Sequence, residues 1–219
     1  MKLVNLFFLS AFFVTSLTLR AQTTKQLYIL GVHMGLASFH ASVAVGEKNN
    51  LEAMKQAIYV SGTSVKDALS MVRQINSVAS YHPFLEVDAL QNLYQAYFSS
   101  IDQNDIEYAR VVVKNDYSGI IALREGYTAQ LSKYNGMSNQ VHAYVMGINI
   151  AIAEGQATVG EAARQIVYAS LVNAKTEAQA LNLDLGPLNE CISLINATTP
   201  IAEIYTKIVS MRSTYQSSL

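Results

Sequence analysis

The chain is poor in the residues that cross-link or interrupt a fold: it contains one cysteine, no tryptophan and three prolines. A single cysteine cannot form a disulfide within the chain, so the fold must be stabilised by packing. We expect Cys191 to be a small buried apolar residue on a short helix rather than a reactive thiol. Pro83, Pro187 and Pro200 each stand where a helix would begin, the position in a helix that tolerates proline.

Charged residues are also scarce, at 14% of the chain against about a quarter in a typical soluble domain. The net charge of −1 is too mild to suggest a protein that binds nucleic acid or an anionic membrane surface, and we predict neither partner. So few charges also mean that much helix surface is buried, either inside the fold or between the copies of a homo-oligomer.

The motifs of common catalytic and cofactor sites are missing. The sequence has no G-x-S-x-G or S-x-x-K nucleophile motif, no H-E-x-x-H metal motif, no C-x-x-C-H haem attachment and no glycine-rich phosphate loop. The Glu-x-x-His pairs of di-iron bundles are absent as well. We therefore assign no catalytic residue and no cofactor, and a non-catalytic protein is the favoured interpretation.

The N-terminus has the pattern of a secretory signal peptide. Lys2 is followed by an uncharged apolar run over residues 3–19 and then by Ala21 before a polar stretch. We predict that residues 1–21 are a signal peptide and that residues 22–219 form one exported domain, in a bacterial periplasm or outside the cell. The alternative is a retained membrane anchor, because about 17 apolar residues are just enough to span a bilayer.

Apolar residues recur at helical spacing over most of the chain, and no run shows the convincing alternation of a strand. The pattern predicts an all-α bundle of about eight or nine helices. Gly119 and Gly126 lie inside the longest helix, and two interior glycines favour a kink or break near Gly126. The predicted helices cover residues 26–45, 49 onward, 63–79, 83–101, 104–134, 138–154, 158 onward, 187–196 and 200–215.

The sequence resembles itself at an offset of 109 residues. Residues 32–61 align with residues 141–170 without gaps, and nine of the thirty positions are identical, where chance gives roughly two. We interpret this as a duplication that produced two pseudo-repeats, residues 26–101 and 137–217, joined by the long helix. In each repeat a glycine, Gly46 or Gly155, is expected to end the first helix, and a capping sequence to start the second.

Residues 26–46 and 134–153 contain no Asp, Glu, Lys or Arg. Each stretch is long enough to cross a membrane, but each carries His, Ser, Asn or Gln side chains that are costly in hydrocarbon. We predict instead that the two stretches are central helices, and that the mature protein does not span a membrane. Rows of small residues four apart would let their backbones approach closely. These rows are Gly31/Gly35, Ala37/Ala41 and Gly147/Ala151/Gly155.

His33 and His142 occupy equivalent positions in the two pseudo-repeats, and His40 and Asn149 follow them by seven residues, on the same helix face. If the repeats pack about a two-fold axis, His33 and His142 could face each other and bind a metal or a haem iron, whose identity the sequence does not give. The more ordinary interpretation is that each histidine is a buried residue with a hydrogen-bond partner.

Two functions are favoured by these features, ahead of an enzyme of unrecognised type. The favoured one is an exported, non-catalytic binding or structural module of the bacterial envelope or exterior, whose partner is an unidentified protein or envelope component. The alternative is a periplasmic bundle that binds a small ligand or metal through His33, His40, His142 and Asn149. The tyrosine content supports the first, because tyrosine is common at binding surfaces. Six of the thirteen tyrosines cluster in mid-chain, namely Tyr94, Tyr97, Tyr108, Tyr117, Tyr127 and Tyr134.

Overall fold

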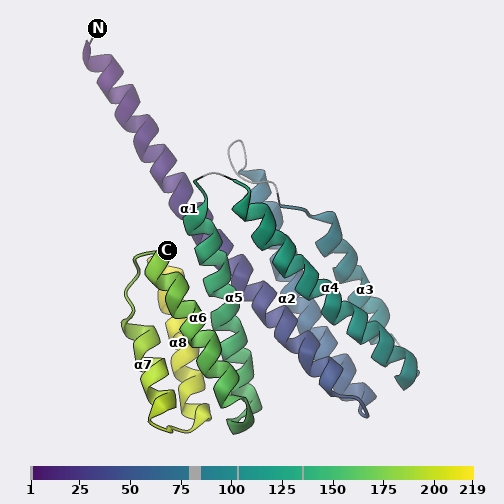
Figure 1. The fold of residues 1–219 in the computed structure, drawn as a ribbon. Coiled ribbons are helices and arrows are strands. Elements are labelled where there is room, and N and C mark those ends of the chain that lie inside the picture. Colours follow the sequence, from purple (N-terminus) through teal and green to yellow (C-terminus); the bar gives the residue numbers. More distant parts are fainter. Residues whose placement is uncertain (1, 79–84, 103, 135) are drawn as a thin grey trace.

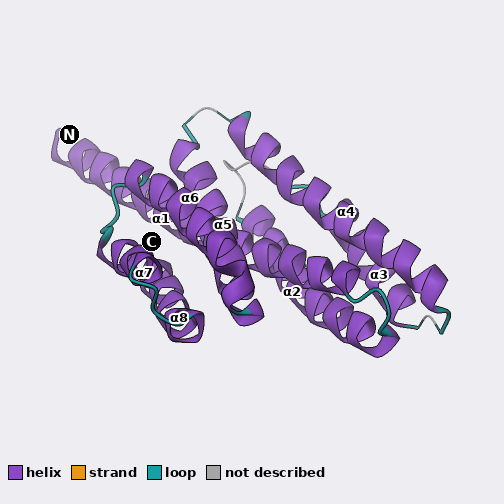
Figure 2. Ribbon diagram, turned by 60° about the horizontal axis from the view of Figure 1, so that its bottom comes forward, coloured by secondary structure: helices purple, strands orange, loops and turns teal. Residues whose placement is uncertain are grey.

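The structure is a computed structural model that describes residues 2–78, 85–102, 104–134 and 136–219, with side chains from Thr23 onward. The described residues form eight α-helices and one short 3₁₀ turn, without a strand, which confirms the predicted all-α bundle (Figure 2). The helices are α1 (Lys2–Gly46), α2 (Leu51–Ser77), α3 (Asp88–Ile101), α4 (Ile106–Ser132), α5 (Ser138–Val159), α6 (Arg164–Ala180), α7 (Gly186–Asn196) and α8 (Ile201–Ser218), with the 3₁₀ turn at Glu161–Ala163.

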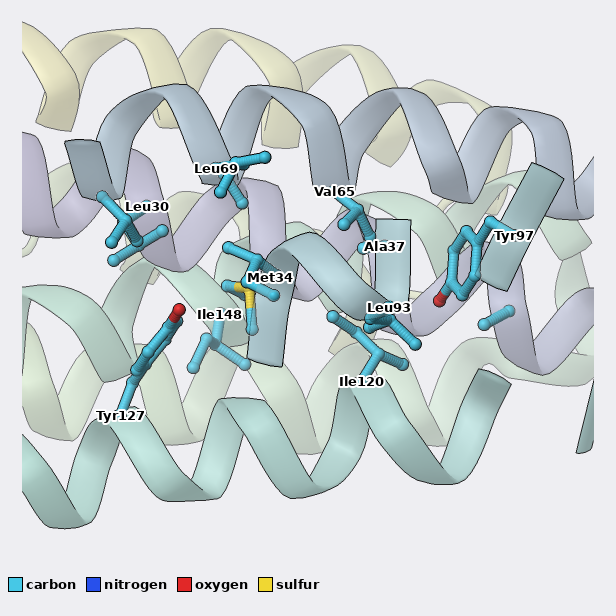
Figure 3. Packing of buried hydrophobic residues seen from close by; sticks show 14 of the residues in the cluster. Leu30, Met34, Ala37, Val65, Leu69, Leu93, Tyr97, Ile120, Tyr127 and Ile148 are labelled. Atoms are coloured by element: carbon cyan, nitrogen blue, oxygen red, sulfur yellow. The ribbon is translucent and has the colours of Figure 1, made fainter. Parts of the chain in front are cut away.

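The helices form two groups on either side of a crossing between α1 and α5 (Figures 1 and 2). Helices α2, α3 and α4 pack on the side of α1, and α6, α7 and α8 pack on the side of α5. Each group has its own apolar core, and residues of α1 and α5 contribute to both cores. Figure 3 shows the first core, where Met34 of α1 lies among side chains from the neighbouring helices.

Glycines bring α1 and α5 into backbone contact, which confirms the close approach predicted from the small residues. A Cβ atom at Gly31 would collide with the carbonyl oxygen of Tyr144, and one at Gly147 would collide with that of Tyr28. A Cβ atom at Gly35 would lie 2.7 Å from the carbonyl oxygen of Ile148. The contacts advance together along both helices, so α1 and α5 run in the same direction (Figure 1).

Two tyrosine hydrogen bonds connect the helix groups reciprocally. Tyr28 of α1 donates to the carbonyl oxygen of Arg212 in α8 at 3.1 Å, and Tyr144 of α5 donates to that of Arg124 in α4 at 3.3 Å. Both tyrosines are fully buried, so these hydroxyls need partners that the opposite group supplies. Each group therefore donates one tyrosine hydrogen bond from its central helix to the other group.

The contacts between α1 and α5 follow a different offset from the one in the sequence. Tyr28 and Tyr144 make equivalent contacts, as do Gly31 and Gly147, and each pair is 116 residues apart rather than 109. The difference of seven residues is about two helical turns and keeps the same helix face. The duplication stays a prediction. The long helix expected to join the repeats is α4, which packs against α1 and α3 inside the first group.

Several helix boundaries differ from the predicted ones. Helix α2 is one continuous helix where two were expected, and α4 is unbroken through Gly126. Helix α1 ends at Gly46, as predicted, although Gly46 does not adopt the left-handed conformation of a cap. Asn50 caps α2, its side chain accepting the Ala53 N–H at 3.1 Å. Helix α3 begins at Asp88, and its predicted start at Pro83 lies outside the described residues.

Gly155 does not end α5, contrary to the prediction. Its Cβ position would overlap the Phe39 ring of α1, so the glycine serves the helix contact, and the chain turns instead at Gly160, where φ is +94°. The predicted capping box also fails to form. Thr158 donates to the Gly155 carbonyl oxygen, and Glu161 accepts the Ile201 N–H at 2.8 Å, which ties the start of α8 to the turn before α6.

Candidate functional site

The two equivalent histidines each pair with a carboxylate in their own helix group. His33 Nδ1 lies 3.9 Å from Asp67 Oδ2 of α2, and His142 Nδ1 lies 2.6 Å from Glu177 Oε2 of α6. Burial lowers the pKa of His33, and the Asp67 carboxylate partly opposes that effect. Each histidine therefore lies beside a carboxylate on the next helix of its own group, and only His142 is within hydrogen-bond distance of its carboxylate.

The two residues predicted beside them also have local contacts. His40 packs edge-on against the Phe39 ring with 5.0 Å between ring centroids, and burial lowers its pKa. Asn149 donates to the Val145 carbonyl oxygen at 2.9 Å, one turn earlier in α5. Among the residues that the structure describes, no group of three or more His, Cys, Asp or Glu side chains could hold a metal ion. A ligand site at His33 or His142 thus rests on the sequence pattern.

Aromatic side chains gather between α2 and α3 on the outer side of the first helix group. They line a cavity of about 330 Å³, which we term the aromatic groove. Tyr59 is 58% exposed and Phe98 is 50% exposed, so two large apolar side chains of the groove face solvent. Tyr94 packs edge-on against Phe98 at 4.9 Å between ring centroids. The groove is lined by Tyr59, Gly62, Thr63, Lys66, Tyr94, Tyr97, Phe98 and Ile101.

The aromatic groove continues along α2 into a basic region. A second hollow of about 540 Å³ shares Lys66 and Tyr94 with it and extends to Arg73 and Ser77. Arg73 Nη2 donates to the Gln91 side chain of α3 at 2.8 Å, which holds the guanidinium over this region. From Tyr59 to Ser77 the surface follows about 27 Å of helix, at roughly 1.5 Å per residue. One surface therefore carries aromatic rings at one end and two cations further along.

A third cavity, between α3 and α4, contains a buried carboxylate. Asp116 is only 3% exposed, and it lines an open groove of about 560 Å³. Its Oδ2 accepts a hydrogen bond from the Ser100 hydroxyl at 2.5 Å. Burial raises the pKa of Asp116 to about 6, although the Ser100 hydrogen bond favours the charged form and limits the rise. We term this cavity the acidic groove.

Sequence reasoning missed Asp116, although a signal was present. Val113, Ile120 and Tyr127 recur every seven residues along α4 and are buried. Asp116 follows Val113 by three residues, which puts it on the same face of the helix as these apolar residues. A carboxylate at a core position of a heptad pattern is a buried charge, and buried charges are rare without a partner. The predicted tyrosine cluster divides, because Tyr97 and Tyr127 belong to the core while Tyr108 and Tyr134 are exposed.

Comparison of the chain with protein-family models, with curated proteins and with solved structures found no match. The described residues define an all-α bundle with two grooves on its first helix group.

Proposed function

We propose that this protein is an exported, non-catalytic binding module, and that the aromatic groove is where a protein partner of the cell envelope or exterior docks. The observation that carries the proposal is the pair Tyr59 and Phe98. Both line the aromatic groove and are half-exposed, and the same surface continues to Lys66 and Arg73. Contiguous exposed apolar surface rimmed by polar residues is typical of interaction sites.

The chemistry of the surface indicates the kind of partner. Aromatic side chains contribute large apolar area with little loss of conformational entropy, and they are enriched among the residues that dominate binding energies. The two cations favour a segment that carries carboxylates at the matching position. The expected partner is thus a protein segment with apolar side chains that cover Phe98 and acidic residues that face Lys66 and Arg73.

Export depends on the fate of the N-terminal segment. One described helix, Thr23–Gly46, is long and apolar enough to cross a bilayer by length and composition, and just over half of it is buried inside the protein. Cleavage after Ala21 would leave this stretch in place, with Leu27 and Tyr28 fully buried. The N-terminal segment is compatible with a signal peptide, which supports secretion as part of the proposal.

We expect the exported protein to begin at Gln22. N-terminal sequencing of protein recovered from the periplasm or medium measures this directly, and residues 22–219 produced alone should unfold at the same temperature as the processed protein. A full-length chain found only in the membrane fraction would instead establish the retained anchor.

We expect a photo-reactive benzoylphenylalanine at Phe98 to cross-link one discrete protein in the producing cells. The same probe at Val172, an exposed position on α6, serves as the control and should give no such product. Reversing the charge of Lys66 and Arg73 to glutamate should reduce the Phe98 product about tenfold, since it places like charges against the acidic partner. Reversal of the exposed Lys114 and the partly exposed Lys175 should leave the yield unchanged.

Three results would contradict the proposal: no product from Phe98, the same product from Val172, or a yield that the Lys66 and Arg73 reversal does not change. A product that contains a second copy of this chain would reassign the groove to self-association. The ligand- or metal-binding alternative gains no support from the described residues, because His33, His40, His142 and Asn149 each have their own local contact.

A further inference from the structure

The acidic groove runs along the outer surface of the α3–α4 pair and is distinct from the aromatic groove between α2 and α3. Along α4 it extends from Asn115 to Gln130, about 22 Å at roughly 1.5 Å per residue. Its walls carry few polar atoms because small residues from both helices face it. These small residues are Ala89, Ala96, Gly119, Ala122 and Gly126.

The groove has one buried charge near one end, and its walls are mainly apolar, although Asn92, Asn115 and Tyr127 also line it. Asp116 lies toward the Asn115 end, while Glu86 and Gln130 mark the opposite end. Among the residues that the structure describes, no lysine, arginine or histidine lines the groove, and Asp116 makes no ion pair. A buried carboxylate without a counter-charge is costly, because burial removes the hydration that stabilises the ion.

The one hydrogen bond that Asp116 accepts only partly offsets this cost. The Ser100 hydroxyl lies 2.5 Å from Asp116 Oδ2, but it also lies 3.1 Å from the Ala96 carbonyl oxygen. A hydroxyl has one proton and cannot donate fully to both acceptors. The carboxylate therefore has unused acceptor capacity beside an open cavity.

We propose that the acidic groove binds an amphiphilic organic cation, with its ammonium group at Asp116 and its hydrocarbon chain along the small-residue walls toward Gly126. A cation supplies the counter-charge that Asp116 lacks, and the chain removes apolar wall surface from water. An anion of the same shape would be repelled by Asp116 and by Glu86. A neutral chain would cover the carboxylate without compensating its charge. Charge complementarity thus selects the cation.

The proposal is tested by titrating n-octylammonium into the mature protein, residues 22–219, at pH 7.5, where Asp116 is ionised. Isothermal titration calorimetry and amide chemical shifts report the binding. We expect saturable one-to-one binding with shifts confined to α3 and α4, and affinities for octanoate and octanol at least about tenfold weaker. Absence of saturable binding, or equal binding of octanoate, would overturn the proposal.

Variants separate the charge from the shape of the groove. Asp116→Asn keeps the size and a hydrogen bond to Ser100, so it should fold normally and lose at least about tenfold in octylammonium affinity. Gly126→Leu should also fold, since a Cβ there meets nothing within 4 Å, and its side chain should block the apolar wall. Glu125→Gln is the matched control, an exposed carboxylate on the same helix that does not line the groove.

An equal loss in Asp116→Asn and Glu125→Gln would show that the long-range negative field, rather than the groove, attracts the cation, and would overturn the site. Unchanged octylammonium affinity in Gly126→Leu would also overturn the site. These readouts do not involve Phe98 or Lys66, so the cation site and the aromatic groove can fail independently.

Discussion

Replacing Gly31 with alanine is expected to lower the free energy of unfolding by about 3 kcal/mol, at the upper end of the usual cost of overpacking. The added methyl group would collide with the Tyr144 carbonyl oxygen of α5, and a backbone atom in a packed helix cannot move aside as a flexible side chain can. Gly147→Ala should cost a similar amount, because its methyl group would meet the Tyr28 carbonyl oxygen. Urea denaturation of each variant measures the loss.

Gly126→Ala is the matched control for this experiment. Gly126 is also inside a helix, but a Cβ there meets nothing within 4 Å, so the substitution should stabilise the protein by about 1 kcal/mol through helix propensity. The Gly31→Ala/Gly147→Ala double variant should lose less than the sum of the single losses, because both methyl groups push apart the same pair of helices. A stabilising Gly31→Ala, like that of Gly126, would contradict the close contact between α1 and α5.

Removing the positive charge of Arg212 is the second change with a large expected effect. Arg212 Nε lies 2.7 Å from Glu154 Oε2, and Glu154 is 8% exposed, so Arg212→Met leaves a nearly buried carboxylate without its partner. We expect a loss of about 3 kcal/mol, since breaking one side of a buried ion pair costs about 3–5 kcal/mol and Arg212 itself is partly exposed. Methionine preserves most of the apolar packing of the arginine chain.

The loss in Arg212→Met should shrink as the pH falls. Burial raises the pKa of Glu154, and Arg212 opposes that rise, so removing Arg212 raises the pKa further. The folded variant then binds a proton more readily than the unfolded chain, and acidification toward pH 4 stabilises it relative to the unmodified protein. Adding Glu154→Gln should recover much of the loss at pH 7. A deficit that neither pH nor Glu154→Gln changes would exclude this ion pair as its cause.

The sequence was sufficient where the signal is local or periodic. Helical spacing predicted an all-α fold, the small residues around Gly31 and Gly147 predicted a close helix contact, and Cys191 is buried as expected, with the pKa of its thiol raised to about 11 by burial. These features depend on residue type and on neighbours within a few turns, which a single sequence displays.

The features that the sequence did not predict depend on partners far along the chain. Glu161 was assigned to a capping box, but its carboxylate accepts the N–H of Ile201, forty residues later. His33 and His142 find Asp67 and Glu177, which lie 34 and 35 residues away on other helices. No local pattern identifies such partners, because tertiary packing alone brings them together.

The register of α1 against α5 illustrates the same limit. The offset of 109 residues aligned His33 with His142 and suggested that they meet, whereas the helix contact pairs Gly31 with Gly147 at an offset of 116. Both offsets keep the apolar face of the helix inward, so hydrophobic patterning cannot distinguish them. The glycines distinguish them, since only one register puts each glycine against the other backbone.

The parallel crossing of α1 and α5 holds the two helix groups together, and proton–proton contacts at its glycines test it most directly. In a nuclear Overhauser spectrum of the mature protein, the Hα protons of Gly147 should give cross-peaks to Tyr28 and Val32, and those of Gly31 to Tyr144 and Ile148. Cross-peaks from Gly31 to Gln140 in their place would show that the 109-residue register is correct. The absence of cross-peaks between the two helices would show that the groups do not pack through this contact.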